Sequence, residues 1–415
     1  MAKSLHTHDV IVVGGGASGM MAAGIAAEAG KRVLLLEKND VLGAKLAISG
    51  GGRCNILNAQ EDERALLSHY GEAAPFLFSA FSEFGMQESV AFFERIGVPI
   101  VIEKLNRAFP KSQHAPSVVA ALEDYLRKGN VEVRLNTEIA RIKTEAGAIT
   151  SIVAQGFEFS ADSYIFATGG VSHPETGSTG DGFSWLSELG HTVLSPTPTI
   201  VPLAAKEKWI HKLKGTTFEN AKITFFQDGV RSFSKKGNIL LTHFGLSGPT
   251  ILNSAGDVAD LLHAGTVTAA IDLFPTKDIG ILDQELVALF DSNKNKLLRN
   301  ALPSLIPSSC VEVLLGLVPE IDPDTKVHSV TKEQRRVLVD LFKGLPATIT
   351  GLMGFSRAVV ADGGVTLAEI DMRTMRSTKI SNLLVTGDLL DITRPSGGYS
   401  LQLCWTTGYI AGKNA

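Results

Sequence analysis

The pattern of apolar residues along the chain predicts several short strands that are buried on both faces. Continuous apolar runs of this kind are typical of a parallel sheet that is covered by helices on either side. An alanine-rich helix, Met20–Ala29, is expected between the first two of them. The predicted buried strands are Val10–Val13, Arg32–Leu36, Tyr164–Ala167 and Leu383–Thr386. The chain is therefore predicted to have an α/β fold with a Rossmann-like domain.

The remaining elements of this domain lie in two separate parts of the chain. Its amphipathic segment 76–96 carries phenylalanines on the face that is expected to be buried. The other predicted elements are a helix over Ala115–Lys128, a small β-meander within 131–160, a helix over Phe183–Leu189, a strand pair at Ser356–Ala361 and Gly364–Leu367, and a final helix from Gly397 to about Ala411.

The residue pattern changes near Leu194, where three prolines occur within a short span. Short β segments follow up to about residue 275, and helical segments, including Lys294–Leu302, continue to about 345. The run Gly344–Pro346 is typical of a linker. We therefore predict a discontinuous domain, 1–193 and 346–415, that carries an insertion over 194–345. The insertion is β-rich over 194–275 and helical over 276–345.

A glycine-rich turn connects the first predicted strand to the first helix. Gly14, Gly16 and Gly19 form the spacing G-x-G-x-x-G, with Ala17 and Ser18 between the last two. In such a turn the first glycine permits the bend, the second lets a pyrophosphate approach, and the third allows close helix packing. Glu37 ends the next strand, where an acid accepts the ribose hydroxyls. This combination predicts dinucleotide binding.

A second glycine-rich segment spans Gly43–Asn55. Three consecutive glycines do not suit a helix or strand interior, but they suit a backbone that wraps closely around a flat ligand. Lys45 and Arg53 are placed to neutralise phosphates or a reduced cofactor. Cys54 has two interpretations, a redox thiol or a small packed residue. The predicted cofactor contacts here are Lys45, Ser49, Gly50, Gly51, Gly52, Arg53, Cys54 and Asn55.

Two further turns after strands make FAD the predicted cofactor, because NAD alone would need only the first turn. Asp388 is expected to hold the ribitol or pyrophosphate, and the amides at the start of the last helix are expected to face the flavin O2 end. There the positive helix end favours the charge of the reduced flavin. The remaining predicted contacts are Lys38, Ile139, Ala167, Thr168, Gly169, Gly387, Gly397, Gly398, Tyr399, Ser400 and Leu401.

Composition restricts the partners and the compartment. The chain has 415 residues, a net charge of −4 and a pI near 6.2, which argues against nucleic-acid and anionic-membrane binding. Its three cysteines show neither disulfide nor metal-ligand spacing, so a reducing cytoplasm is expected. No apolar run approaches the roughly 18 residues of a membrane span. The oligomeric state is left open.

The chain resembles a known family, and the resemblance covers its whole length. The segments GGGASG, SGGGRCN, THFGLSGPTIL and GGYSLQ are similar to those of HI0933-like, or BaiN-like, flavoproteins, which are bacterial NAD(P)/FAD-dependent oxidoreductases. The resemblance implies a fumarate-reductase-like FAD domain with an inserted β-barrel and helical part, and non-covalent FAD. The chain departs from the family pattern at Ile392–Gly397, at Ser400, where Asn is usual, and at Cys404.

Three residues are candidates for chemistry on a substrate. His243, at the end of an apolar strand, is a candidate proton donor; the alternative is a histidine bonded to backbone. Arg107, in a predicted loop, and Arg394 are candidate anchors for a carboxylate or enolate; the alternative is a surface salt bridge for each. The loop from Thr242 to Gly248 is expected to line the flavin cleft between the FAD domain and the insertion.

The predicted activity is that of a reductase or dehydrogenase. It would transfer hydride between NAD(P)H and a small unsaturated or carbonyl substrate. The sequence shows one G-x-G-x-x-G unit, so the nicotinamide is expected to bind transiently. An oxygen-using amine or aminoketone oxidase is an alternative, and so is a non-catalytic flavin-binding sensor or scaffold. No metal is expected.

Overall fold

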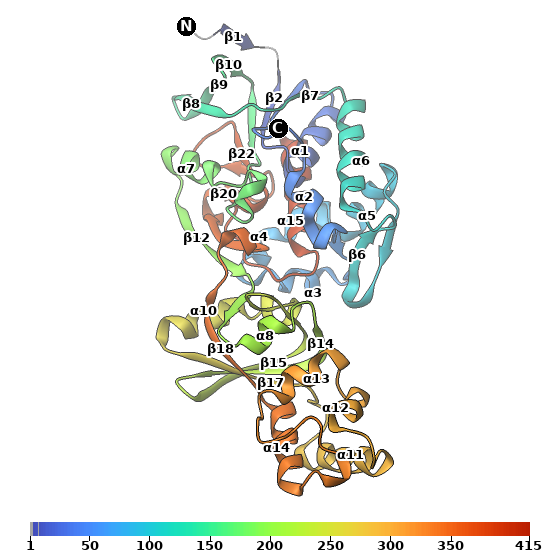
Figure 1. Ribbon diagram of the computed structural model, residues 1–415. Coiled ribbons are helices and arrows are strands. Elements are labelled where there is room, and N and C mark those ends of the chain that lie inside the picture. Colours follow the sequence, from blue (N-terminus) through green and yellow to red (C-terminus); the bar gives the residue numbers. More distant parts are fainter. Residues whose placement is uncertain (1–2, 7) are drawn as a thin grey trace. The chain divides into compact units, whose positions relative to one another are not determined.

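The computed structural model describes residues 3–6 and 8–415, and these divide into two compact units. Unit 1 comprises the residues up to Pro198 together with Val359–Ala415, and unit 2 comprises Thr199–Ala358. Figure 1 labels the elements of both. The fold is a Rossmann-type FAD-binding domain with an inserted β-barrel and helical part. Among the described residues, no helix has the length and apolar character needed to cross a membrane.

The core of unit 1 is a seven-stranded sheet in which the five consecutive strands from β22 to β7 are parallel. β2 and β11 lie side by side with Val13 opposite Phe166, and every residue of both strands is buried. The order of the strands is β20 (Ile370–Asp371), β21 (Arg376–Ser377), β22 (Leu383–Val385), β11 (Ser163–Phe166), β2 (Val10–Val13), β3 (Val33–Leu36) and β7 (Glu132–Arg134).

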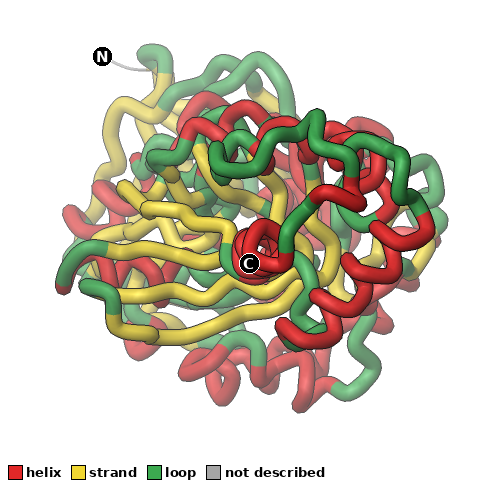
Figure 2. Tube along the Cα trace, turned by 60° about the horizontal axis from the view of Figure 1, so that its bottom comes forward, coloured by secondary structure: helices red, strands yellow, loops and turns green. Residues whose placement is uncertain are grey.

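Helices cover this sheet, and two of them pack against each other through small residues. A Cβ at Gly408 of α15 (Tyr399–Asn414) would lie 2.5 Å from the Ser18 carbonyl oxygen of α1 (Ala17–Glu28). The C-terminus lies at the end of α15 (Figure 2). The other helices of unit 1 are α2 (Ala44–Ile48), α3 (Glu63–Ser68), α4 (Ala74–Glu83), α5 (Met86–Arg95), α6 (Ala115–Lys128) and α7 (Asp181–Glu188).

Three small sheets complete unit 1. The predicted meander is present as β8, β9 and β10, and β1 adds to its edge in parallel with β10. The small sheets are β1 (Lys3–His6), β10 (Phe157–Ser160), β9 (Ala148–Ala154) and β8 (Ile139–Glu145); β4 (Leu57–Asn58), β6 (Arg107–Pro110) and β5 (Ile100–Ile102); and β12 (Val193–Ile200) with β19 (Val360–Val365).

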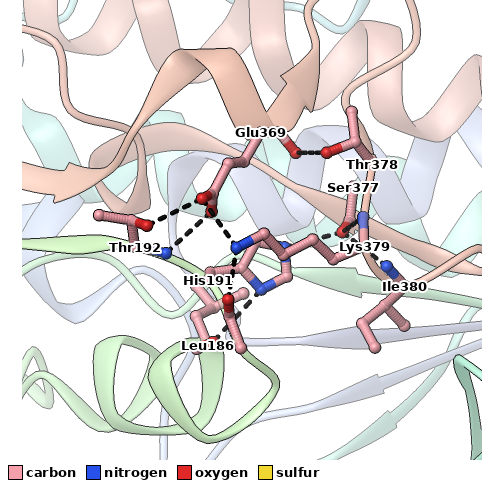
Figure 3. A network of polar contacts seen from close by, with 9 residues as sticks. Leu186, His191, Thr192, Glu369, Ser377, Thr378, Lys379 and Ile380 are labelled. Carbon is pink, nitrogen blue, oxygen red and sulfur yellow. Dashed lines mark hydrogen bonds and ion pairs between the residues drawn. The ribbon is translucent and has the colours of Figure 1, made fainter.

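A buried polar network fixes the end of α7 in unit 1 (Figure 3). The Ser377 hydroxyl accepts from the amides of Lys379 and Ile380, so its own hydrogen goes to His191 Nε2 at 2.7 Å. His191 Nδ1–H is then left to donate to the Leu186 carbonyl. Burial lowers the pKa of His191, which agrees with this neutral form. Glu369 belongs to the same network. Burial raises the pKa of its carboxyl group, but hydrogen bonds from Lys379 and Thr192 outweigh the effect of burial and lower the pKa to about 2.

Unit 2 consists of a closed antiparallel barrel and a helical part. The barrel strands follow the order β13 (Leu203–Ala205), β16 (Gly245–Ser247), β15 (Val230–Leu241), β14 (Thr217–Gln227), β17 (Val267–Asp272) and β18 (Leu345–Leu352). The helices of the unit are α8 (Lys208–Lys212), α9 (Pro249–Leu252), α10 (Ala255–Ala264), α11 (Ile279–Ser292), α12 (Leu298–Ala301), α13 (Ser308–Leu315) and α14 (Lys332–Lys343).

Four local predictions are wrong. Gly344–Pro346 is not a linker, because Leu345 begins β18 and Pro346 is only the second residue of that strand, near the end where proline is tolerated. The strand pair within 356–367 is the single strand β19, because Gly363 meets the backbone of Pro196 instead of making a hairpin. Of the helix predicted over Lys294–Leu302, only α12 forms, because Leu297 pairs with Lys326. Arg107 begins the strand β6 instead of lying in a loop.

Candidate functional site

The first glycine turn lies where β2 leads into α1. Gly14 has a φ of +101°, and a Cβ there would lie 2.6 Å from the Ala167 carbonyl oxygen. A Cβ at Gly19 would overlap the carbonyl oxygen of Gly14, whereas one at Gly16 would meet no atom within 4 Å. Gly14 and Gly19 are therefore required by the protein's own packing. Gly16 leaves open space at the start of α1, on the side that a ligand would need.

Glu37 is buried beside this turn. Its carboxylate accepts hydrogen bonds from the Gly15 amide at 2.6 Å and from the Asn39 amide at 2.8 Å. The carbonyl of Glu37 accepts from the Thr137 amide, which places the start of β8, with Ile139, nearby. Each carboxylate oxygen has a second lone pair for a ligand hydroxyl. Lys38, by contrast, is engaged with Asp181 at 2.6 Å.

The segment from Gly43 to Asn55 folds as α2 followed by a 3-10 turn in which Gly50, Gly51 and Gly52 all have positive φ. A Cβ at Gly51 or Gly52 would meet no atom within 4 Å. The hydroxyl of Ser49 donates to the Leu46 carbonyl, and the backbone carbonyl of Ser49 accepts from the Cys54 amide. The local fold therefore depends on Ser49 and leaves the triple glycine uncovered.

The side chains of Arg53 and Cys54 do not suit the chemistry predicted for them. The Arg53 guanidinium pairs with Glu103, donates to Gln113 and lies 4.0 Å from the centre of the Phe109 ring. Its charge is thus already neutralised by the protein. Cys54 is fully buried, and burial raises its pKa to about 12. A reactive thiol needs the thiolate form, so these surroundings favour the packing role for Cys54.

The start of α15 packs on β4 through glycine. At Gly398, with a φ of +104°, a Cβ would lie 2.5 Å from the Leu57 carbonyl oxygen, and Asn58 donates to the Gly397 carbonyl. The Tyr70 hydroxyl donates to the carbonyl of Tyr399. Gly398 is therefore required by the approach of β4, and the expectation that the amides at this helix start face the flavin stays a prediction. Gly398 is the N-cap residue and has no side chain with which to cap this helix end.

An ion pair with a buried arginine lies in the segment of the chain between β22 and α15. Arg394 is 3% exposed and pairs with the Asp388 carboxylate. The same guanidinium donates to the Ser400 hydroxyl at 3.1 Å and to the Ile392 carbonyl at 2.6 Å. Because its side chain is 1% exposed and each of its nitrogens already donates to the protein, Arg394 is not accessible to a substrate carboxylate in this arrangement. The predicted anchoring role therefore does not fit.

Arg107 also differs from its expected role. Its Nε donates to the Lys104 carbonyl at 3.3 Å, and its guanidinium lies 5.9 Å from the centre of the Phe109 ring. In β6 it stands opposite Asn58 of β4, the strand on which α15 begins. Arg107 is half-buried and pairs with no carboxylate among the described residues. Its role as a substrate anchor stays a prediction.

The residues present fit FAD in unit 1. The buried oxygens Thr168 Oγ1 and Asn55 Oδ1 find no hydrogen-bond partner among the described residues. Both come from predicted contact segments, and buried polar atoms are normally paired. Together with the open space at Gly16, Gly51 and Gly52, they are what a bound polar ligand would complete. Ser172, which accepts from Lys45 Nζ at 3.2 Å, was missed because a single serine in a loop gives no local signal.

His243 lies in unit 2, on an exposed pocket beside the barrel. The Thr242 hydroxyl accepts from the Gly245 amide at 3.1 Å and so shapes the loop in which His243 stands. The ring of His243 contacts Phe244, and no hydrogen bond joins it to the part of the chain that is described. The alternative of a histidine bonded to backbone is therefore not supported. The pocket is lined by Lys214, Gly215, Leu240, Leu241, Thr242 and His243.

Four exposed lysines accompany this pocket and were not singled out from the sequence. Lys206, Lys208, Lys212 and Lys214 lie on and beside α8, and none forms an ion pair with a described residue. The Gly215 amide donates to Leu241, and the Ala205 amide donates to Phe244, so the chain on both sides of α8 contacts the loop of His243. The orientation of this loop toward the flavin stays a prediction.

Comparisons with known proteins agree with these features. The chain is 29% identical over 407 residues to a 3-dehydro-bile acid delta(4,6)-reductase of Clostridium scindens, covering 97% of this chain and 98% of the relative. It is 28% identical over 409 residues to a ribosomal RNA dihydrouridine synthase of Escherichia coli, covering 98% and 97%. The structure of a 3-ketosteroid-delta4-(5alpha)-dehydrogenase of Rhodococcus jostii shares the fold, with a TM-score of 0.56, 14% identity and coverage of 99% and 96%.

The family is assigned over nearly the whole chain. The family model described as HI0933-like protein Rossmann domain matches residues 8–414, which include both units. Fold, cofactor-site geometry and relatives lead to the same conclusion. The chain belongs to the HI0933-like protein family and is an FAD-dependent oxidoreductase.

Proposed function

We propose that the protein reduces a carbon–carbon double bond conjugated to a carbonyl group in a small molecule, with NAD(P)H as the hydride donor. The names of the two full-length relatives support this reaction class. A 3-dehydro bile acid with delta(4,6) unsaturation is a conjugated ketone, and a dihydrouridine is a uridine whose double bond next to a carbonyl has been reduced. Their substrates differ, but the bond that gains two hydrogens is of the same kind.

Bound FAD accepts a hydride from one partner and delivers it to another. In this proposal, unit 1 holds the FAD. Glu37 binds the ribose hydroxyls, the open turn at Gly16 binds the pyrophosphate, and Asp388 binds the ribitol. One G-x-G-x-x-G unit serves one resident dinucleotide, so the nicotinamide nucleotide binds only for the time of hydride transfer. The observation that carries the FAD assignment is the unpaired Thr168 and Asn55 oxygens at this site.

We also propose that His243 supplies the proton. Hydride addition to the β carbon of an enone leaves charge on the carbonyl oxygen and the α carbon, and a proton must follow. His243 is exposed, lines a pocket and has no hydrogen-bond partner among the described residues. An imidazole in that condition is free to donate a proton, and general acid catalysis contributes about 10²–10⁴-fold.

A second candidate function is the reduction of uridine within RNA. It is favoured by the four lysines of residues 206–214, whose charges are not balanced by ion pairs with described residues. Phosphate contacts by lysine provide most of the sequence-independent affinity for nucleic acid. The overall charge of −4 argued against nucleic acid, but net charge does not describe a local face. The small-molecule reaction remains our first proposal, because the composition of the chain as a whole is not basic.

Anaerobic reaction with NADH or NADPH and a candidate acceptor tests the proposal. We expect flavin bleaching by one of the two nucleotides, followed by formation of a product that is two mass units heavier than an added enone. RNA oligonucleotides containing uridine serve as the second acceptor. Bleaching by neither nucleotide, together with oxygen-dependent turnover of amines, would replace the reductase proposal with the oxidase alternative.

A further inference from the structure

Arg394 is an unusual residue for the place it occupies. Its side chain is 1% exposed and lies against Ser400, in the first turn of α15. The N-terminal end of a helix carries partial positive charge, so a cation there is unfavourable unless negative charge compensates it. Burying an arginine also costs free energy unless it is paired. Asp388 provides one negative charge at this point.

The other charged groups do not balance the surplus. Lys45 lies close enough to Arg394 and Asp388 for their charges to affect it, and burial lowers its pKa. Cys404 is next to the same groups, but burial raises its pKa to about 12, so it stays neutral. Glu175 also acts on Lys45, but it is exposed and pairs with His173 at 2.7 Å. Two basic side chains and a positive helix end thus lie near one carboxylate, that of Asp388, whose side chain is 20% exposed.

We propose that Lys45 and Arg394 together stabilise the negative charge that FAD gains on reduction, and that Ser400 and Asp388 hold Arg394 in place for this purpose. This rests on FAD occupying unit 1 and not on the identity of the substrate. Arg394 donates to the Ser400 hydroxyl at the start of α15, so the pair is placed to tune the cofactor instead of anchoring a substrate.

Sulfite provides the test, because it adds to oxidised flavin and leaves a negative charge on the ring without any substrate. In the FAD-loaded protein, we expect Arg394→Met to raise the sulfite dissociation constant about tenfold. A tenfold change corresponds to a fall in the two-electron potential of about 30 mV. Lys45→Met should act in the same direction, and Arg394→Lys, which keeps the charge, should remain within about threefold of the parent.

The matched control is Arg335→Met in unit 2. Arg335 forms a comparable ion pair with Asp283, with an Nε–Oδ1 distance of 2.5 Å, and this variant should lower stability but leave sulfite binding and potential unchanged. Unchanged sulfite binding in Arg394→Met would overturn the proposal. If Arg394→Met does not retain FAD, Lys45→Met and Ser400→Ala replace it in the test. Unchanged sulfite dissociation constants in both of these variants would also overturn the proposal. Neither readout uses a substrate, so failure here is separate from failure of the proposed reaction.

Discussion

The proposed cofactor site of unit 1 and the His243 pocket of unit 2 are formed by different kinds of groups. Unit 1 uses backbone turns whose glycines either have no room for a side chain, as at Gly19, or leave open space, as at Gly16. It combines the paired carboxylate of Glu37 with the unpaired oxygens of Thr168 and Asn55. The unit 2 pocket uses exposed side chains on a barrel, and its lysines and histidine have no such partners among the described residues. The first arrangement specifies one ligand closely. The second leaves its exposed side chains less constrained.

The largest expected effect is the difference between alanine substitutions at two glycines of the same turn, Gly19 and Gly16. Gly19→Ala places a Cβ against the Gly14 carbonyl, so we expect it to abolish or severely reduce folding of unit 1. The Cβ added by Gly16→Ala would meet no protein atom within 4 Å, and the backbone φ at this position is an ordinary −79°. This variant should therefore fold normally but lose FAD. Circular dichroism and the flavin content of the purified proteins measure both. A fully FAD-loaded Gly16→Ala variant would contradict the placement of the pyrophosphate.

Glu37→Ala should yield largely apo protein. The change removes the acceptor of two backbone amides and of the proposed ribose hydroxyls, and hydrogen bonds to a charged group are worth roughly 1.5–3 kcal/mol each. Acid release followed by chromatography measures the bound cofactor, and it should identify FAD in the parent protein. Glu132→Ala is the control, because that partly exposed carboxylate of unit 1 pairs with Arg134 and His8. Full loading of Glu37→Ala would exclude Glu37 as the ribose ligand.

His243→Gln tests the unit 2 pocket and should have a smaller effect on the protein than either change above. We expect about 10²-fold slower product formation, with normal FAD content and normal flavin reduction by the nicotinamide nucleotide. His263→Gln, an exposed histidine elsewhere in unit 2, is the control. Unaltered turnover by His243→Gln would remove the residue from the reaction.

The smallest effect concerns the pH dependence of stability. His191 is buried in its neutral form, and its pKa in the folded protein is below the ordinary value near 6.5. As the pH falls below that value, the unfolded chain takes up a proton that the folded chain does not. The free energy of unfolding should then decrease by at most about 1.4 kcal/mol per pH unit from this group. Melting temperatures between pH 7 and 5 should show a shallower decline for His191→Gln than for His328→Gln, which replaces an exposed histidine.

Much of unit 1 could be predicted from sequence because its constraints are local. The glycine spacing, the buried strands and Glu37 follow each other in the chain, and each restricts the backbone by itself. The turn at Gly363 was misinterpreted, and the packing of Gly398 was not predicted, because what these glycines approach, Pro196 and Leu57, is remote in sequence. The same holds for Arg53 and Arg394, whose pairing with Glu103 and Asp388 depends on tertiary structure. Lys208 and Lys212 are four residues apart on α8, but two lysines at helical spacing do not by themselves mark a binding face.

The most direct test of the account is the anaerobic reoxidation of the pre-reduced flavoprotein. We expect a conjugated enone to restore the oxidised flavin spectrum with one equivalent of saturated product per flavin, and to do so faster than dissolved oxygen does. A saturated ketone of the same carbon skeleton is the control and should cause no reoxidation. If oxygen alone reoxidises the flavin, and neither the enone nor a uridine-containing RNA does, the protein is not a reductase of conjugated double bonds.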